Sequence, residues 1–411
     1  MSSNLSPETQ ELDLSNEEQS ALFSSRILVV DDSMLIRELI GACLKAGGYQ
    51  NVQFAVNGLE ALEMIEEEIP DLIILDLEMP KMDGFEVCKK LRANPQTRNI
   101  PVLIESGRDT AADITKAFEF GASDMVVKPI KKYEILARTK VHLENKIYIA
   151  RLQSFHDRVA SELEQARKLQ LDICPQQNDL KDFAERYNLD LGWHYEPSSE
   201  LGGDIGGILP INEHQIAFYV ADFSGHGVAA SLNTFRMQTW LASASDLYAH
   251  PDQLFNELNN FLNKNLSTGS YATMLYFCLD VKEGELTYAI AGSQPPLLQN
   301  PATGPNFEIM SASGLPLGLQ SGWQYKSQTI PFGANCKVIA YSDALVEVEA
   351  EHGGFLGDEG LRDDLNRHWS ADQSGNQILE SLVTNFHKLT FGEQPDDLTI
   401  IYLENRNSDE T

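Results

Sequence analysis

Acidic, hydroxyl and basic side chains follow successive apolar runs within residues 26–130. Asp31 and Asp32 follow the first run, Asp76 the third, Ser106 the fourth and Lys128 the fifth. These residue types suit phosphoryl transfer to a carboxylate: Asp76 would attack phosphorus, while Mg²⁺ held by Asp31, Asp32 and Asp76 neutralises the charge. Lys128 would pair with the phosphoryl oxygens, and the Ser106 hydroxyl would bond a further one. A single Asp at a strand end is usually a cap or turn residue, but capping does not account for the whole set.

The elements that must bring these residues together are indicated by apolar runs that alternate with amphipathic stretches. The runs predict strands at Ile27–Val30, Val52–Ala55, Leu72–Leu75, Pro101–Ile104 and Met125–Val127. The stretches predict helices at Leu35–Lys45, Gly58–Glu67, Gly84–Arg92 and Ala111–Phe120. Repeated β/α units of this kind predict an α/β fold with a five-stranded parallel sheet covered on both faces. The polar residues then share the carboxyl edge of the sheet, where such folds bind ligands.

Three segments carry a resemblance to a known family: residues 29–33 (VVDDS), 76–84 (DLEMPKMDG) and 128–129 (KP). They resemble the CheY-like receiver domain of two-component response regulators, which implies a flavodoxin-like fold over residues 25–143. The resemblance also implies that Asp76 is phosphorylated by a sensor histidine kinase with Mg²⁺ bound. Two residues depart from the pattern, since Met125 replaces the usual aromatic switch residue and Glu105 replaces a buried apolar one.

Two charged residues beside this set have no assigned role. Glu78 and Arg108 each lie two positions beyond a motif residue. We hypothesise that they face each other across the phosphorylation site and limit the access of water. The alternative is that both are solvated loop charges.

A long helix is predicted for the connector, residues 144–187. Neither Gly nor Pro occurs between Pro129 and Pro175, so a helix from about Ile135 to Ile173 is uninterrupted. Apolar residues recur every three or four positions at Leu152, Phe155, Val159, Leu163, Ala166, Leu169 and Ile173. This stripe predicts a coiled coil and a homodimer, or else it is buried against the helix's own domains. Residues 162–175 (ELEQARKLQLDICP) resemble the helix before bacterial SpoIIE-like phosphatase domains, with matches at Ala166, Arg167, Gln170 and Pro175.

Residues 188–405 contain a second group of acidic residues, which lie at strand ends and turns. These residues are Asp204 in 201–204 (LGGD), Asp222 in 221–230 (ADFSGHGVAA), Asp343 in 341–343 (YSD), and Asp396 and Asp397 before Leu398. Hard cations such as Mg²⁺ and Mn²⁺ take oxygen ligands, and a binuclear site needs several carboxylates. Two such ions can share a water molecule, lower its pKa and direct it at a phosphate.

In this order, the segments resemble the metal-dependent protein phosphatase (PPM) family, in its SpoIIE-like branch. The resemblance implies a site for two Mn²⁺ or Mg²⁺ ions built from Asp204, Asp222, the Phe223 carbonyl, Asp343, and Asp396 or Asp397. Asp396 is favoured over Asp397 as the ligand. His226 and Glu347 are expected to support the ligands rather than bind metal. Gly206, Gly207 and Ala344 depart from the family pattern without removing a core ligand.

The secondary structure of this part is predicted to be mixed. Strands are expected at Leu189–Tyr195, Gln215–Val220, Tyr271–Asp280, Glu285–Ala291, Cys336–Tyr341 and Leu398–Leu403. Helices are expected at His226–Tyr248, Pro251–Asn265 and Asn376–Leu389. The segment Gln294–Pro316 is rich in Pro, Gly and Ser and is expected to be a loop. We therefore expect an α+β domain with two central sheets flanked by helices.

Bulk composition excludes several classes of function. A net charge of −30 leaves no basic surface for nucleic acid. The five cysteines are scattered, which indicates a reducing cytoplasm rather than disulfides or zinc. No apolar run reaches the length of a membrane span, and no signal segment is recognised at the N-terminus. Residues 1–24 are acidic and polar and are expected to be disordered, and residues 406–411 form a polar tail.

The sequence therefore predicts a cytoplasmic serine/threonine phosphatase controlled by phosphorylation of its receiver, with activation expected. By family resemblance, the substrate would be a phosphorylated anti-sigma-factor antagonist. The alternative is a non-catalytic adaptor whose degenerate phosphatase domain binds a sigma factor or its regulator. Retained acids at every expected ligand position favour the enzyme. The sequence does not identify the kinase, the substrate or the preferred metal.

Overall fold

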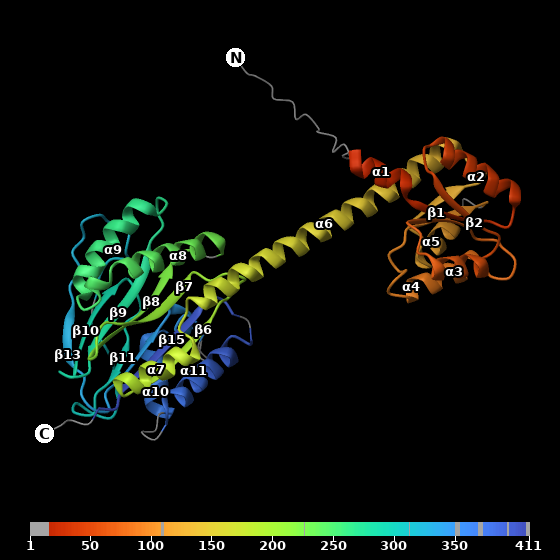
Figure 1. Cartoon of the computed structure of the whole chain (residues 1–411). Coiled ribbons are helices and arrows are strands. Elements are labelled where there is room, and N and C mark those ends of the chain that lie inside the picture. Colours follow the sequence, from red (N-terminus) through yellow and green to blue (C-terminus); the bar gives the residue numbers. More distant parts are fainter. Residues whose placement is uncertain are drawn as a thin grey trace, which may run out of the picture. The chain divides into compact units, whose positions relative to one another are not determined.

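A computed structural model describes residues 16–107, 111–225, 227–311, 313–349, 354–368, 373–392 and 394–407. The chain divides into two compact units, Met1–Val159 and Ala160–Thr411 (Figure 1). Within the described residues, no helix combines the length and apolar character needed to cross a membrane.

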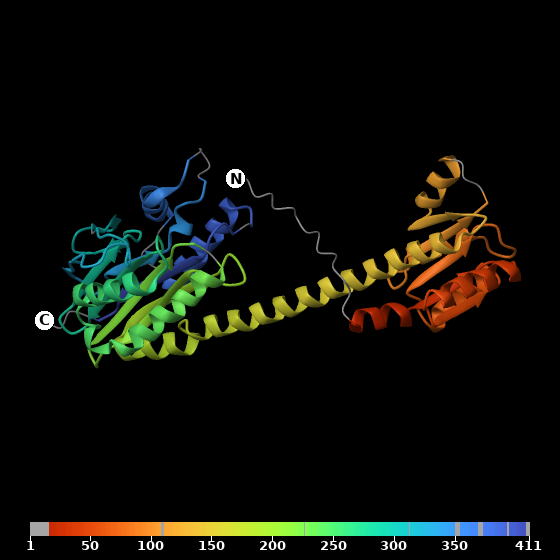
Figure 2. The same cartoon turned by 90° about the horizontal axis from the view of Figure 1, so that it is seen from above.

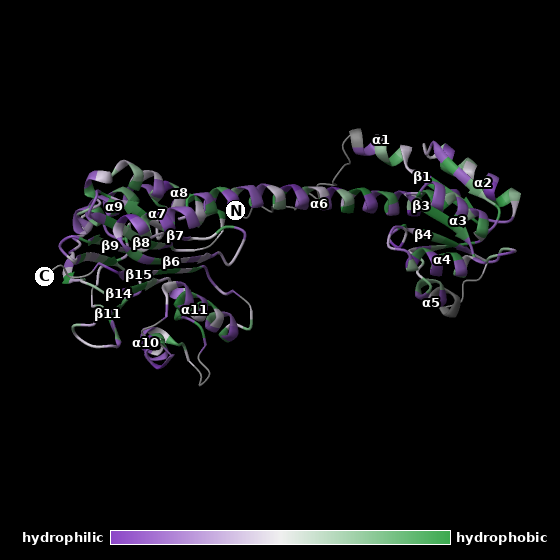
Figure 3. Ribbon diagram, turned by 60° about the horizontal axis from the view of Figure 1, so that its bottom comes forward, coloured by the Kyte–Doolittle hydropathy of each residue, from purple (hydrophilic) through white to green (hydrophobic). Residues whose placement is uncertain are grey.

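The first unit contains a parallel sheet with strand order β2-β1-β3-β4-β5. Its strands are β1 (Arg26–Val30), β2 (Asn51–Ala55), β3 (Leu72–Asp76), β4 (Val102–Ser106) and β5 (Asp124–Val127). The intervening helices are α2 (Met34–Ala46), α3 (Gly58–Glu67), α4 (Gly84–Ala93) and α5 (Ala111–Glu119). Apolar residues are concentrated in the strands (Figure 3) and pack against helices on both faces of the sheet. The predicted five-stranded α/β fold is confirmed.

An additional helix, α1 (Asn16–Ser24), precedes the first strand. The sequence prediction placed residues 16–24 in a disordered segment, and this prediction is wrong for them. Leu22 is buried in the core that α2 shares with the sheet, and the Phe23 ring lies 5.8 Å from the Tyr49 ring. These apolar contacts stabilise a short helix whose acidic composition alone suggested none.

Helix α6 (Lys132–Asp172) forms most of the connector and is continuous (Figure 2). Ile135 and Leu143 are buried in the same core as α2. Further along, Leu152 and Phe155 remain 68% and 56% exposed. Helix α7 (Gln177–Tyr187) follows after a break at Pro175, so the connector contains a second helix.

The second unit contains two sheets, with strand orders β13-β10-β9-β8-β7 and β12-β11-β14-β15-β6. Their strands are β6 (Leu189–Glu196), β7 (Asp204–Pro210), β8 (Gln215–Phe223), β9 (Ala272–Asp280), β10 (Glu285–Ala291), β11 (Leu297–Gln299), β12 (Phe307–Ile309), β13 (Gln328–Pro331), β14 (Lys337–Tyr341) and β15 (Leu398–Asn405). The sheets pack face to face through a core that includes Phe218, Phe277 and Ile401.

Helices cover the outer faces of both sheets. Helices α8 (Val228–Ser243) and α9 (Pro251–Asn265) pack on the sheet that contains β8 and β9. Helices α10 (Gly357–His368) and α11 (Gly375–Leu389) pack on the sheet that contains β14 and β15 (Figure 1). The predicted α+β architecture, with two central sheets flanked by helices, is confirmed.

Two local predictions for this unit were wrong, and several elements, strand β7 among them, were not predicted. The helix expected from His226 to Tyr248 ends at Ser243 and is followed by a separate short turn at Ser245–Leu247. The expected loop Gln294–Pro316 contains the paired strands β11 and β12. Strand β7 was not predicted because Gly206 and Gly207 weaken the strand signal. Gly206 is required because a Cβ there would lie 2.3 Å from the Trp193 ring.

Candidate functional site

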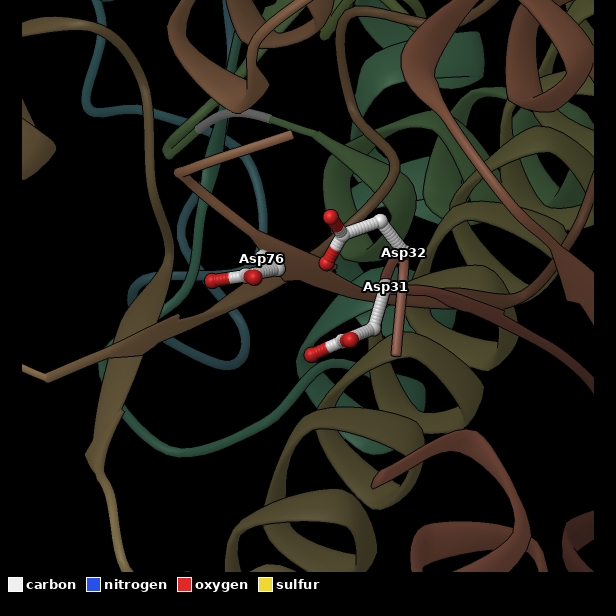
Figure 4. Close-up of side chains that lie close together, drawn as sticks. All are labelled: Asp31, Asp32 and Asp76. Atoms are coloured by element: carbon white, nitrogen blue, oxygen red, sulfur yellow. The ribbon is translucent and has the colours of Figure 1, made fainter. Parts of the chain in front are cut away.

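Three carboxylates gather at the carboxyl edge of the first sheet. Asp31 and Asp32 follow β1 and Asp76 ends β3 (Figure 4), and one oxygen of each lies within 4.8 Å of the others. Asp31 is fully buried, Asp76 nearly so, and Asp32 is exposed. This oxygen-only donor set fits a hard divalent cation, because clustered carboxylates repel one another unless a cation offsets their charge.

Lys128 follows β5 and lies beside this cluster. Its Nζ is 3.0 Å from Asp31 Oδ2 and 3.1 Å from Asp76 Oδ2. Burial raises the pKa of the Asp76 carboxyl, and the hydrogen bond from Lys128 acts in the opposite direction. Burial lowers the pKa of Lys128, but the bonds to Asp31 and Asp76 outweigh this effect, so that its pKa is raised overall. The ammonium group thus remains charged where a phosphoryl group on Asp76 would need a cation.

The loop after β3 is held close to this edge. The backbone amide of Glu78 donates to the Asp76 carboxylate, and the Glu78 side chain is exposed. A Cβ on Gly84 would lie 2.4 Å from the Asp76 carbonyl oxygen, so only glycine fits there. Ser106 ends β4 and is buried. Arg108 lies outside the described residues, so the predicted pair with Glu78 stays a hypothesis.

Glu105 is a buried carboxylate next to this cluster. It is 0% exposed, and neither of its oxygens has a hydrogen-bond partner among the described residues. Burial raises its pKa to about 8; Lys128 lowers the pKa, and the neighbouring carboxylates raise it further. The replacement of an apolar residue by Glu105 therefore places a buried acid beside the expected phosphorylation site.

In the second unit, strand pairing brings the distant acids to one end of the two sheets. Asp204 begins β7 and is the register partner of Asp222 near the end of β8. Asp343 follows β14, and Asp396 and Asp397 directly precede β15, its antiparallel neighbour. The structure therefore brings together the acidic segments that the sequence singled out.

Burial and, after it, mutual repulsion raise the pKa values of carboxyls in the second site. Burial, followed by repulsion from Asp343 and Asp396, raises the pKa of the Asp222 carboxyl to about 7. Burial, then Asp396 and Glu347, raises the pKa of Asp343 to about 6.

Asp204 lies deepest in this group. Burial, then Asp222 and Asp397, raises the pKa of Asp204 well above its ordinary value, although Thr399 Oγ1 donates to it at 2.7 Å. Among the described residues, no lysine or arginine contributes to the raised pKa values of Asp204, Asp222 and Asp343. Such a set fits divalent cations, which would supply the missing positive charge.

Asp396 and Asp397 have different surroundings. Asp397 is buried and accepts four hydrogen bonds, from Ser198 N and Oγ and from the backbone amides of Gly203 and Asp204. Asp396 is exposed, and its Oδ1 accepts the backbone amide of Asp397. Asp397 therefore fastens the Gly203–Asp204 turn, and Asp396 keeps oxygen available for a ligand.

Two family models match the chain. Residues 27–140 match the model described as "Response regulator receiver domain", and residues 212–406 match the model described as "Stage II sporulation protein E (SpoIIE)". The chain joins a receiver domain to a SpoIIE phosphatase domain.

Curated relatives match the receiver domain. The response regulator PleD of Caulobacter vibrioides is 42% identical over 130 residues, which are 32% of this chain and 28% of PleD. The response regulator MprA of Mycobacterium ulcerans is 41% identical over 120 residues, 29% of this chain and 50% of MprA. The match thus spans about half or less of the length of these relatives.

A solved structure matches more than half of the chain. The SiaA-PP2C domain of Pseudomonas aeruginosa superposes with a TM-score of 0.53 and 19% identity, and the match covers 61% of this chain and 98% of that one. At this level of identity the similarity shows the fold, which is that of a PP2C domain.

Sequence reasoning missed one contact of the SpoIIE domain. Gln170 near the end of α6 is buried; its Nε2 donates to the Gly202 carbonyl at 2.8 Å, and its Oε1 accepts from the Gly202 amide at 3.1 Å. In the sequence, only the resemblance of residues 162–175 to the helix before SpoIIE-like domains marks Gln170. His226 lies outside the described residues, and the roles predicted for the ligand residues, Phe223 and Glu347 included, stay predictions.

Proposed function

We propose that this protein is a response regulator whose phosphorylation on Asp76 by a sensor histidine kinase controls a metal-dependent phosphoserine/phosphothreonine protein phosphatase. The pairing of a receiver domain with a SpoIIE phosphatase domain supports this proposal. In the receiver, Mg²⁺ would be held by Asp31, Asp32 and Asp76, and Lys128 would pair with the phosphoryl group.

The observation that carries the regulatory part is the pair of hydrogen bonds between Gln170 and Gly202. Gly202 lies two residues before Asp204, and the intervening Gly203 amide donates to Asp397. A change in α6 would therefore reach the backbone that positions a predicted metal ligand. We expect receiver phosphorylation to act through α6 and to activate the enzyme.

In the SpoIIE domain, Asp204, Asp222, Asp343 and Asp396, with the Phe223 carbonyl, would hold two Mn²⁺ or Mg²⁺ ions. When bound, the metals would supply an activated water molecule for attack on a phosphate ester. The chain's own contribution is to gather the carboxylates, and Asp397 and Thr399 hold Asp204 in place. Family resemblance supports a phosphorylated anti-sigma-factor antagonist as substrate.

We further propose that the protein is a homodimer formed through α6. The exposed side chains of Leu152, Phe155 and Leu169 support this, since large apolar groups repeated along a helix favour burial against a partner. A second copy of the same helix presents the same stripe.

The test measures hydrolysis of p-nitrophenyl phosphate by the full chain with Mn²⁺, with and without beryllofluoride as a phosphoryl mimic. Activity that requires Mn²⁺, is lost in Asp343→Asn and rises with beryllofluoride would support the proposal. The phosphorylated anti-sigma-factor antagonist is then offered as the protein substrate. No hydrolysis in any state, with no Mn²⁺ bound by calorimetry, would favour the non-catalytic adaptor.

A further inference from the structure

Glu105 occupies a position in β4 from which its carboxylate competes for Lys128. It is the register partner of Asp76 on the neighbouring strand, and its Oε2 lies 4.0 Å from Lys128 Nζ. It is completely buried, and both of its oxygens lack a hydrogen-bond partner among the described residues. When ionised, a carboxylate at a buried site is poorly solvated, so its attraction to the Lys128 ammonium group is strong.

Lys128 has a limited number of N–H donors, for which the neighbouring carboxylates and the phosphoryl oxygens compete. An ammonium group has three N–H donors, and Asp31 and Asp76 accept from Lys128 at 3.0 and 3.1 Å. When Mg²⁺ and a phosphoryl group are bound, Asp31 would ligate the metal and Asp76 would carry the phosphoryl group. Glu105 has neither task, so it remains the carboxylate that draws Lys128 away from the phosphoryl oxygens.

We propose that Glu105 is a positioning residue that holds Lys128 back from the phosphoryl group and so weakens the phosphorylated state of this receiver. The inference rests on the proposed phosphorylation of Asp76. In this role the Glu105 carboxylate lowers the stability of the phosphorylated receiver because it lies close to the Lys128 ammonium group. A neutral or apolar side chain at this position releases Lys128.

The test titrates the full chain with beryllofluoride in saturating Mg²⁺ and measures binding by calorimetry. The titration is made above about pH 8, where the Glu105 carboxyl is ionised. Glu105→Gln keeps the shape and removes the charge, and Glu105→Leu places an apolar residue there; each should tighten beryllofluoride binding about tenfold. Thr139→Val is the matched control, since Thr139 is also fully buried with an unpartnered hydroxyl and is not among the ion-pair partners of Lys128.

A second comparison separates positioning from a general packing effect. If Glu105 acts through Lys128, Glu105→Gln changes beryllofluoride affinity in the wild-type background but not in a Lys128→Gln background. Equal or weaker binding by both Glu105 variants, even with a higher melting temperature, would overturn the inference, since Glu105 would then only cost stability.

The proposed phosphorylation can fail separately. If the wild type binds no more beryllofluoride than Asp76→Asn does, then the phosphorylation proposal fails and the inference falls with it. If the wild type binds more beryllofluoride than Asp76→Asn does, and the Glu105 variants bind it as the wild type does, the phosphorylation proposal stands and the inference alone is rejected.

Discussion

Gln170 Nε2 donates a hydrogen bond to the Gly202 carbonyl at 2.8 Å, and Gly202 N returns one to Gln170 Oε1. One buried amide side chain thus satisfies both backbone groups of a residue two positions before Asp204. Helix α6 and the acidic site of the SpoIIE domain are therefore joined by a specific contact rather than by chain continuity alone.

Gln170→Ala should lower Mn²⁺-dependent hydrolysis of p-nitrophenyl phosphate by about tenfold or more. Both Gly202 backbone groups would be left unpaired in a buried site, at a cost of about 1–3 kcal/mol each, and the turn that carries Asp204 would shift. The steady-state kcat measures this effect. Thr234→Val is the control, because Thr234 Oγ1 contacts Gln170 at 3.4 Å but not Gly202. Equal losses in the two variants would contradict the special role of Gly202.

Replacing the two neighbouring acids should separate stability from metal binding. Asp397→Asn should lower the free energy of unfolding of the metal-free protein by about 3 kcal/mol, because it weakens the charged hydrogen bonds to Ser198 and Gly203. Asp396→Asn should leave that free energy unchanged or slightly higher, because it relieves repulsion, and should abolish Mn²⁺ binding. Calorimetry in EDTA and then with Mn²⁺ measures both quantities. Normal Mn²⁺ affinity in Asp396→Asn would exclude Asp396 as a ligand.

The stability of the receiver should depend on pH through Glu105. The pKa of Glu105 is raised from 4.5 to about 8 in the folded protein, so between these values the folded chain retains a proton that the unfolded chain has released. The stabilisation from this retained proton is fully present below pH 4.5 and is lost as pH rises through about 8.

Chemical denaturation of the wild type and Glu105→Gln at several pH values checks this expectation. The wild type should lose stability relative to Glu105→Gln as pH rises, because glutamine does not titrate. A difference that stays constant from pH 4.5 to pH 8 would show that Glu105 is not held protonated by its surroundings.

Mn²⁺ affinity of the SpoIIE domain should rise as pH increases through about 6 and 7. The carboxyls of Asp343 and Asp222 have pKa values raised to about these values, and each must release its proton before it can bind metal. Calorimetric titration of the metal-free chain at about pH 5.5 and at about pH 8, on either side of these pKa values, measures the change in Mn²⁺ affinity. A pH-independent affinity would show that these carboxyls are already ionised, or do not bind the ions.

Charge introduced into the exposed stripe of α6 should dissociate the proposed dimer. Leu152→Asp and Phe155→Asp place a carboxylate where each partner helix would bury an apolar group. Light scattering after size-exclusion chromatography measures the molar mass. Ser154→Asp adds the same charge at an exposed position outside the stripe and should leave the mass unchanged. A wild-type protein that is already monomeric at working concentration would refute the dimer.

The sequence by itself determined much of the fold and most of the expected site. Alternation of apolar and amphipathic segments was sufficient for the strands of the first sheet, because the central strands β1 and β3 are buried on both faces and largely apolar. The positions of the acidic residues at strand ends could also be predicted, because many of them lie in turns beside glycine. Strand β7 was missed because Gly206 is required by contact with Trp193, a residue of the other sheet.

Tertiary structure decided the relationships that depend on side chains from distant segments. The family resemblance favours Asp396 over Asp397 as a ligand, but only the structure shows that Asp397 accepts from the amides of Gly203 and Asp204 while Asp396 stays exposed. In the sequence, Glu105 is only a charged residue in place of a buried apolar one; the structure shows that it lies beside Lys128. The periodicity of apolar residues in a segment predicts which of its side chains are buried. The partner of a buried polar group depends instead on which strands are neighbours in the fold.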